Sequence, residues 1–178
     1  ACHGPGRRHV QLAKDDALET GDAAGFPVSL AARGTWAFPK ADSASPDRAA
    51  PAAAIARRSE PLAGRSQIDT CARCHARRGT LGAYRHGQPL SDTHRLALLD
   101  APLYYPDGQI LDEVYVYGSF VQSRMHQAGV VCSNCHEPHS NRLRAPGNGV
   151  CAQCHQSTVF DTPDHHRHPA GGAGSQCV

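Results

Sequence analysis

The pattern of apolar and polar positions predicts few regular elements, and the first of them is a helix over residues 8–20. One face of this helix would carry His9, Leu12, Ala13 and Ala17. Gly21 follows as a stop signal, because glycine readily adopts the left-handed conformation that ends many helices. His9 therefore shares an otherwise apolar face, where a histidine is either a buried core residue or a ligand.

A second helix of two turns is expected after the N-cap signal at Ser91 and Asp92, and it should end before Pro102. Its apolar stripe, at helical spacing, would consist of Leu90, His94, Ala97 and Leu98. We therefore expect His94 to point toward whatever this helix packs against.

Residues 110–117 alternate enough to form a strand or an extended arm that ends at the following glycine. Ser119 with Gln122 then forms a capping-box pattern, which opens a short helix with Gly129 at its C-terminal end. The apolar face of this helix would consist of Val121, Met125 and Ala128. His126 lies beside that face, one position round the helix.

The segment 22–66 shows little periodicity, and residues 41–65 within it are a mixture of alanine, proline, arginine and serine. Such a composition is typical of a surface loop or linker, so we expect no chemistry there. Trp36 and Phe38 are expected to pack against a neighbouring segment or the edge of a cofactor.

The composition limits the core that the chain can build from its own side chains. Of 178 residues, 40% are hydrophobic but only 6% are aromatic, and 17 glycines and 13 prolines interrupt the remaining elements. The length favours a single domain over residues 1–178. We predict a mainly α fold with little regular secondary structure, in which bound groups complete the core.

The spacing of the cysteines indicates what those groups are. Complete C-x-x-C-H motifs occur at residues 71–75, 132–136 and 151–155. In this motif two thiols add across the vinyl groups of a haem, and the histidine binds the iron. The predicted attachment residues are Cys71, Cys74, Cys132, Cys135, Cys151 and Cys154, with His75, His136 and His155 on the irons. Short helices and loops would then wrap around three stacked c-type haems.

Other uses of paired cysteines fit these residues less well. Tetrahedral zinc gives no reason for a histidine after each pair, and a thioredoxin-like dithiol would appear once, inside a βαβ pattern. All three complete pairs carry the histidine. A zinc- or disulfide-stabilised interaction module is therefore kept only as an alternative.

Both ends of the chain look like parts of two further motifs. Cys2 and His3 resemble the end of a C-x-x-C-H, so they would hold another haem, and Cys177 would begin the next motif. A disulfide between Cys2 and Cys177 is the alternative. Because covalent haem attachment occurs outside the cytoplasm, we expect a periplasmic or otherwise exported protein. The sequence contains no apolar run long enough to span a bilayer.

Each iron needs a sixth ligand, for which the chain offers 12 histidines and one methionine. His94 is the first candidate because of its inward stripe. His126 is preferred to Met125, which we assign to packing. His9 and the loop residue His86 are further candidates.

Two more candidates follow the second and third motifs. His139 cannot bind the iron of His136, because the porphyrin lies between them, so it would serve a neighbouring haem unless it is a surface histidine. In the histidine-rich tract at 164–168, one of His166 and His168 is expected to be a ligand, and spacing does not choose between them.

The formal net charge of +2 omits the two propionates that every haem brings. All the basic residues except two are arginines, whose planar guanidinium groups match carboxylates bidentately. The candidate propionate partners near the motifs are Arg73, Arg77, Arg78, Arg142 and Arg144. A nucleic-acid-binding face is disfavoured, because the arginines are scattered and aromatic residues are few.

Several stretches together carry a resemblance to a known family. They are Cys-His-Gly-Pro-Gly at 2–6, Cys-Ala-Arg-Cys-His-Ala-Arg-Arg-Gly at 71–79, Val-Tyr-Gly-Ser-Phe at 116–120, Cys-His-Glu-Pro-His at 135–139 and Cys-Ala-Gln-Cys-His at 151–155. These resemble the multihaem cytochrome c region of bacterial proteins that also carry tetratricopeptide repeats, and the pair at 132–155 is similar to the doubled C-x-x-C-H motif. The resemblance implies a periplasmic, mostly helical, bis-histidine haem protein related to the hydroxylamine-oxidoreductase and cytochrome-nitrite-reductase superfamily.

The leading functional hypothesis is therefore electron transfer between closely spaced haems, with other redox proteins as partners. The alternative is a redox enzyme that acts on a small nitrogen or sulfur oxyanion at a five-coordinate haem. All three complete motifs end in histidine, whereas some enzymes of the superfamily replace it with lysine, so the carrier is favoured over the enzyme.

Overall fold

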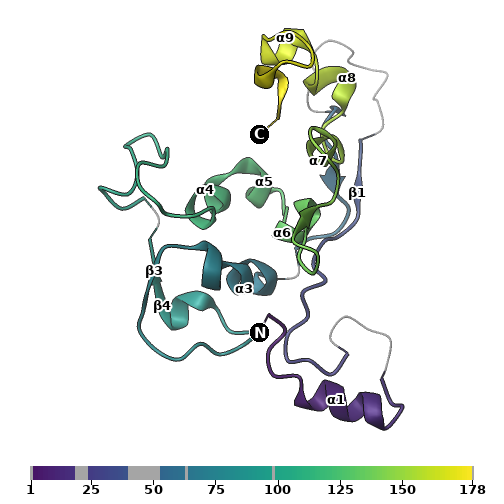
Figure 1. Cartoon of the computed structure of the whole chain (residues 1–178), viewed down its shortest axis with the longest axis vertical. Coiled ribbons are helices and arrows are strands. Elements are labelled where there is room, and N and C mark those ends of the chain that lie inside the picture. The colour runs from purple at the N-terminus through teal and green to yellow at the C-terminus, as the bar shows by residue number, and fades with distance from the viewer. Residues whose placement is uncertain (1, 19–23, 40–52, 63, 98, 178) are drawn as a thin grey trace. The chain divides into compact units, whose positions relative to one another are not determined.

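The computed structural model describes residues 2–18, 24–39, 53–62, 64–97 and 99–177 (Figure 1). The chain divides into two compact units. The first unit consists of Ala1–Ala32 and Leu62–Cys132, and the second of Arg33–Pro61 and Ser133–Val178. Each unit therefore combines an early and a late part of the sequence.

Short helices and loops make up most of the first unit. Its elements are α1 (Arg7–Lys14), α3 (Ser66–His75), β3 (Arg78–Thr80), the 3₁₀ turn η1 (Leu90–Asp92), β4 (His94–Leu96), α4 (Tyr117–Gln122) and α5 (Arg124–Gln127). The strands β3 and β4 pair antiparallel, with Gly79 opposite Arg95.

The second unit is built from still shorter elements. They are β1 (Trp36–Ala37), β2 (Arg57–Arg58), β5 (His136–Glu137), β6 (Arg142–Leu143), α7 (Gly149–Ala152), α8 (Ser157–Phe160), α9 (Pro163–His166) and η2 (Ala173–Ser175). Helix α6 (Cys132–Cys135) spans the boundary between the units. The predominance of short helices and loops agrees with the prediction. No described helix combines the length and the hydropathy needed to cross a membrane.

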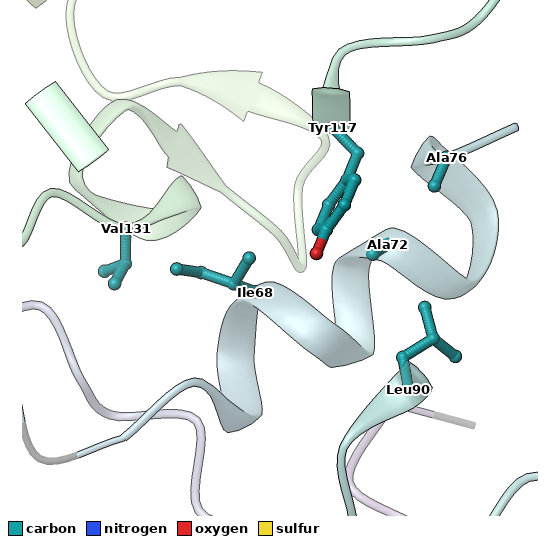
Figure 2. Close-up of a cluster of buried hydrophobic side chains, with 6 residues drawn as sticks. All are labelled: Ile68, Ala72, Ala76, Leu90, Tyr117 and Val131. Carbon is teal, nitrogen blue, oxygen red and sulfur yellow. The ribbon is translucent and has the colours of Figure 1, made fainter. Parts of the chain in front are cut away.

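One face of α3 forms the core of the first unit. Ile68, Ala72 and Ala76 follow one another at four-residue spacing, so they lie on the same side of the helix (Figure 2). Each of them is only 1% exposed. The cluster is completed by Leu90, Tyr117 and Val131.

Polar contacts fix α3 to its neighbours. The Arg65 guanidinium donates to the Tyr117 hydroxyl at 2.9 Å. The Asp69 carboxylate, 8% exposed, accepts from the backbone N–H of Leu90. Because buried polar groups are stable only when paired, these contacts set the position of α3 relative to α4 and η1.

The helix predicted after Ser91 is not present. Residues 90–92 make a single 3₁₀ turn, and residues 94–96 then form β4 against β3. Long-range pairing with β3 overrides the local helical pattern, because the strand satisfies backbone groups of both segments. His94 is nevertheless buried, at 9% exposed, so the expectation of an inward side chain was right for a different structural reason.

The helix predicted over residues 8–20 is shorter than expected. Helix α1 ends at Lys14, after which Asp16 has a φ of 51° and leaves the helical conformation. Gly21, the predicted stop signal, lies outside the described residues. The helix therefore ends at the pair of aspartates, earlier in the sequence than the predicted stop signal.

The helix predicted from Ser119 is divided into α4 and α5. Ser123 lies between them in an extended conformation, and its hydroxyl accepts from the backbone N–H of His126 at 3.1 Å. Ser123 is thus the N-cap of α5, whereas the capping-box pattern predicted a helix start at Ser119. Gly129 has a φ of 87° and follows the end of α5, as predicted.

The predicted strand at 110–117 is reduced to one isolated bridge between Tyr104 and Ile110. The chain enters α4 at Tyr117, so Gly118 lies inside a helix. A Cβ atom at Gly118 would overlap the Tyr104 hydroxyl oxygen. Glycine is therefore required at this position for close packing.

Part of the segment predicted to be a linker is ordered in the second unit. β2 pairs with β1, so that Trp36 lies opposite Arg58. Ala54 and Ala56 are only 2% and 4% exposed. Residues 40–52 of the predicted linker lie outside the described residues.

Candidate haem-attachment site

The first complete motif lies on the C-terminal half of α3. Cys71 is half-buried next to the core residue Ala72, and its thiol hydrogen-bonds to the thiol of Cys132. This contact and burial raise the pKa of Cys71. Cys74 and His75 are exposed. The core face of α3 therefore anchors the motif, while His75, the predicted iron ligand, remains accessible.

The second motif lies on the single turn α6 and is clamped by Arg144. The Arg144 side chain donates to the Ser133 carbonyl, and its backbone N–H donates to the Cys135 carbonyl at 2.9 Å. The β5–β6 hairpin, in which His136 pairs with Leu143, returns the chain to this point. Burial raises the pKa of Cys135.

The third motif lies on α7 and is held by a strand-like segment at 54–56. The Ala56 N–H donates to the Cys154 carbonyl at 2.7 Å, and the Gln156 N–H donates to the Ala54 carbonyl at 2.9 Å. Residues 54–56 belong to the segment that was predicted to be a surface loop or linker. Its alanine-rich composition gives no signal for such a contact.

The cysteines of the second and third motifs lie close together in the second unit. The pKa of Cys154 is raised by burial and then by the Cys135 thiol. The pKa of Cys151 is raised by burial and by the thiols of Cys177 and Cys135. One thiol changes the pKa of another only when the two lie close together, so these pKa shifts show that the four cysteines are near one another. The short loop between His136 and Cys151 thus keeps the two attachment sites near each other.

Two candidate sixth ligands of the first unit share one aromatic ring. The Tyr84 ring centroid lies 5.2 Å from that of His86 and 6.4 Å from that of His94. Arg73, which belongs to the first motif, covers the same ring at 4.2 Å. Tyr84 therefore brings both histidines to the neighbourhood of the first motif.

His86 carries a ring nitrogen that suits metal binding. Its Nδ1 is buried and has no hydrogen-bond partner within the described part of the chain. Burial lowers the pKa of His86, and the Arg73 charge lowers it further. By contrast, the Nδ1 of His94 lies 3.0 Å from the Thr93 hydroxyl. A buried imidazole with an unpaired nitrogen, on the same tyrosine ring as Arg73 of the first motif, is therefore a candidate axial ligand.

The histidines near the start of the chain gather on Phe26. His9 stacks on this ring at 4.3 Å, and His3 lies 5.2 Å from it. Gly4 packs against His86, because a Cβ atom there would stand 3.2 Å from the His86 Cγ. The Cys2-His3 segment and the Tyr84 cluster are therefore neighbours in the first unit.

Phe160 links the third motif to a histidine that the sequence analysis did not single out. The rings of His155 and His165 each lie 5.1 Å from the Phe160 ring, and both are nearly perpendicular to it. His166 and His168, the two predicted candidates, stack on each other at 6.4 Å. The available signal was an aromatic residue midway between two histidines, five positions from each.

The remaining candidates have few contacts with the motifs. His126 lies edge-on to Phe120 at 5.5 Å. Met125, which was expected to pack, is 50% exposed. The His139 side chain is 80% exposed, and its Nδ1 lies 3.3 Å from Glu137. Their roles as ligands remain predictions.

Most of the arginines near the motifs already contact other groups of the chain. Arg77 forms an ion pair with Asp112 at 3.3 Å, and Arg78 donates to the Ala76 carbonyl at 3.3 Å. Arg142 is exposed on β6. Their pairing with haem propionates also remains a prediction.

The described residues place no three side chains of histidine, cysteine, aspartate or glutamate so that they could hold a metal ion by themselves. All eight cysteines are free thiols. The chemistry of the site is therefore that of thiol pairs, each followed by a histidine, which is the donor set of a covalently attached haem.

Comparison with known families supports this interpretation for part of the chain. Residues 126–160 match the doubled CXXCH motif. The match covers the second and third complete motifs and indicates covalent binding of haem c there. No curated protein and no solved structure matches the chain.

Proposed function

We propose that this chain transfers electrons through several covalently bound c-type haems. The doubled CXXCH motif at residues 126–160 carries the proposal, and the motif at 71–75 adds a third attachment site. When bound, the iron of each haem accepts and releases one electron. Attachment sites that lie close together favour transfer from one haem to the next.

The residues of the chain would hold and tune these haems. The paired cysteines fix each porphyrin, and His75, His136 and His155 bind the irons. Cys2 with His3, and Cys177, would belong to two further sites. Partial burial of Cys71 on α3, and of Cys135 and Cys154 in the second unit, would limit the access of water to one edge of each porphyrin, which influences the potential.

For the sixth ligands we assign His86 and His94 in the first unit and His165 in the second. His86 is supported by its buried, unpaired nitrogen, and His165 by the ring that it shares with His155. The other candidates are His9, His126, His139, His166 and His168. Bis-histidine ligation would keep the potentials of these haems low.

The covalent attachment chemistry favours a periplasmic or otherwise exported location, with redox proteins as partners. The resemblance to the multihaem region of tetratricopeptide-repeat cytochromes supports the same setting. A redox enzyme acting on a small oxyanion is the alternative, and it would need one iron without a second protein ligand. Binding of carbon monoxide or nitrite to one haem of the folded, reduced protein would favour that alternative.

A mass measurement tests the proposal directly. The chain is produced in a periplasm that contains the haem-maturation machinery, and its intact mass gives the number of covalent haems. We expect three, on the motifs that begin at Cys71, Cys132 and Cys151. A mass equal to that of the bare polypeptide would contradict the proposal.

The assignment of His165 has a matched control on the same helix. His165→Ala should convert one low-spin haem to high spin, because it removes a sixth ligand, whereas His166→Ala should leave the spin state unchanged. Electron paramagnetic resonance of the oxidised protein distinguishes the two forms. The reverse result would assign the ligand to His166.

A further inference from the structure

The core of the first unit brings together two cysteines from different motifs. Cys71 lies on α3 between Ile68 and Ala72, which belong to the buried cluster. Val131 packs in the same cluster and directly precedes Cys132 (Figure 2). The two thiols hydrogen-bond to each other. The fold of this unit therefore juxtaposes the first cysteine of one motif with the first cysteine of the next.

The two cysteines of the first motif differ in their surroundings. Cys71 is half-buried and in contact with Cys132, whereas Cys74 is exposed. The positions of Cys71 and Cys132 are set by side chains that are 1% exposed, namely Ile68, Ala72 and Val131. The apolar core of the first unit therefore keeps the Cys71 and Cys132 thiols in contact.

A contact of the same kind occurs in the second unit. The Asn148 side chain accepts from the Cys177 N–H at 2.9 Å and donates to the Ser175 carbonyl at 2.9 Å. This places the Cys177 thiol against that of Cys151, to which it hydrogen-bonds. A contact between two thiols that are distant in the sequence is therefore found in both units.

We propose that Cys71 and Cys132 form a disulfide across the two motifs before haem is attached. The oxidant is a disulfide of the exported compartment, either oxidised glutathione or a protein dithiol oxidase. One thiolate attacks the oxidant and releases its first thiol, and the second cysteine then attacks this mixed disulfide. Two S–H bonds and the S–S bond of the oxidant break, a new S–S bond forms, and two oxidant thiols leave with both protons and both electrons.

The disulfide would make maturation of the two motifs interdependent. Addition to a haem vinyl group needs a free thiol, so a single bond blocks the motifs at 71–75 and 132–136 together. Reduction of that bond releases both motifs at once. This consequence rests on the proposed haem attachment, whereas the disulfide itself does not.

Peptide mapping of the haem-free full chain tests the proposal. The chain is oxidised with glutathione disulfide, its remaining thiols are alkylated, and it is digested with trypsin. Cleavage after arginine separates Cys71, in peptide 66–73, from Cys74, in peptide 74–77, while Cys132 lies in peptide 125–142. We expect 66–73 to be linked to 125–142. Linkage of 66–73 to 74–77, or a random mixture of links among the eight cysteines, would overturn the proposal.

Two variants identify the partner within peptide 125–142. Cys132→Ser should abolish the link and leave Cys71 open to alkylation, whereas the control Cys135→Ser should retain the link. A link that persists in Cys132→Ser would show that Cys135 is the partner and would overturn the proposal. The haem count of the matured protein is measured separately. Full haem loading without the disulfide in the haem-free chain would reject this inference and leave the proposed function intact.

Discussion

The two units hold their attachment motifs by different means. In the first unit the motif at 71–75 lies on a helix whose inner face is buried. Among the described residues, the largest fully buried side chains all belong to this unit: Ile68, Leu90, Val114 and Val131. In the described part of the second unit, the buried hydrophobic residues are Ala54, Ala56 and Val150. The motif at 151–155 is held there by backbone hydrogen bonds with residues 54–56, in which the Ala56 N–H donates to the Cys154 carbonyl and the Ala54 carbonyl accepts from the Gln156 N–H.

This difference indicates how each unit depends on its cofactors. Burial of one leucine or isoleucine side chain contributes roughly 1.5–3 kcal/mol, whereas a methyl group contributes about 0.8 kcal/mol. The first unit therefore gains substantial stability from its own side chains, whereas the second gains little. Small folds with such poor cores usually depend on metals or other bound groups, and porphyrins would serve this purpose in the second unit.

The largest expected effect is that of haem omission. In the chain produced without haem, amides of α3 should remain protected from hydrogen exchange, while amides of α7 and of β5–β6 should exchange at nearly unfolded rates. In the haem-loaded protein both sets should be protected. Hydrogen exchange read by mass spectrometry measures this, and equal protection of both units without haem would contradict the comparison.

Truncation in the core should weaken the first unit alone. Ile68→Ala should lower the free energy of unfolding of this unit by about 3 kcal/mol, because it leaves a cavity where the side chain is 1% exposed. Leu81→Ala makes a similar change at a position that is 72% exposed and should have little effect. Exchange rates of the α3 amides report the difference. A similar loss in both variants would mean that Ile68 does not govern the stability of the unit.

A smaller and local effect is expected in the second unit. Ala56→Pro removes the N–H that donates to the Cys154 carbonyl and should cost about 2–3 kcal/mol locally. Ala56→Gly keeps that N–H and serves as the control. The exchange rate of the Gln156 amide, which bonds to Ala54, is the readout in the haem-loaded protein. Equal rates in the two variants would show that the 54–56 segment does not hold the third motif.

The chemistry of the site was more predictable from the sequence than the fold. The C-x-x-C-H spacing is a local covalent requirement, so the motifs were recognised without any knowledge of the tertiary structure. His94 was expected on a helix but lies on β4, because its pairing with β3 depends on residues far along the chain. The local pattern around Ala56 carries no sign of its contact with Cys154.

For the candidate sixth ligands, too, the tertiary contacts could not be predicted from local sequence patterns. His165 became a candidate through its ring contact with Phe160, which also contacts His155, because spacing along the chain does not show which rings meet. The unpaired nitrogen of His86 likewise results from packing against Gly4 and Tyr84, which are far apart in the sequence. Periodicity predicts which face of one helix or strand a side chain occupies. The geometry of a ligand set depends on how several such elements pack together.

The smallest expected effect concerns the pH dependence of the first unit. Burial raises the pKa of Asp69 above its ordinary value of 3.8, against the opposing effect of Arg65. The folded chain therefore binds this proton more tightly than the unfolded chain, so the free energy of unfolding falls as the pH rises from the ordinary pKa through the raised one. Asp69→Asn removes this titration and keeps an acceptor for the Leu90 N–H.

As the pH rises above about 4, the Asp69→Asn variant should therefore lose less stability than the unmodified chain. The difference should be smaller than the loss in Ile68→Ala and should be confined to the first unit. The difference in stability is measured from the exchange rates of α3 amides in the two proteins. The rates are compared at the same pH, because intrinsic exchange itself depends on pH. Amides of the second unit provide the internal control. Identical pH slopes in the two proteins would show that the buried Asp69 carboxyl does not contribute to the pH dependence of stability.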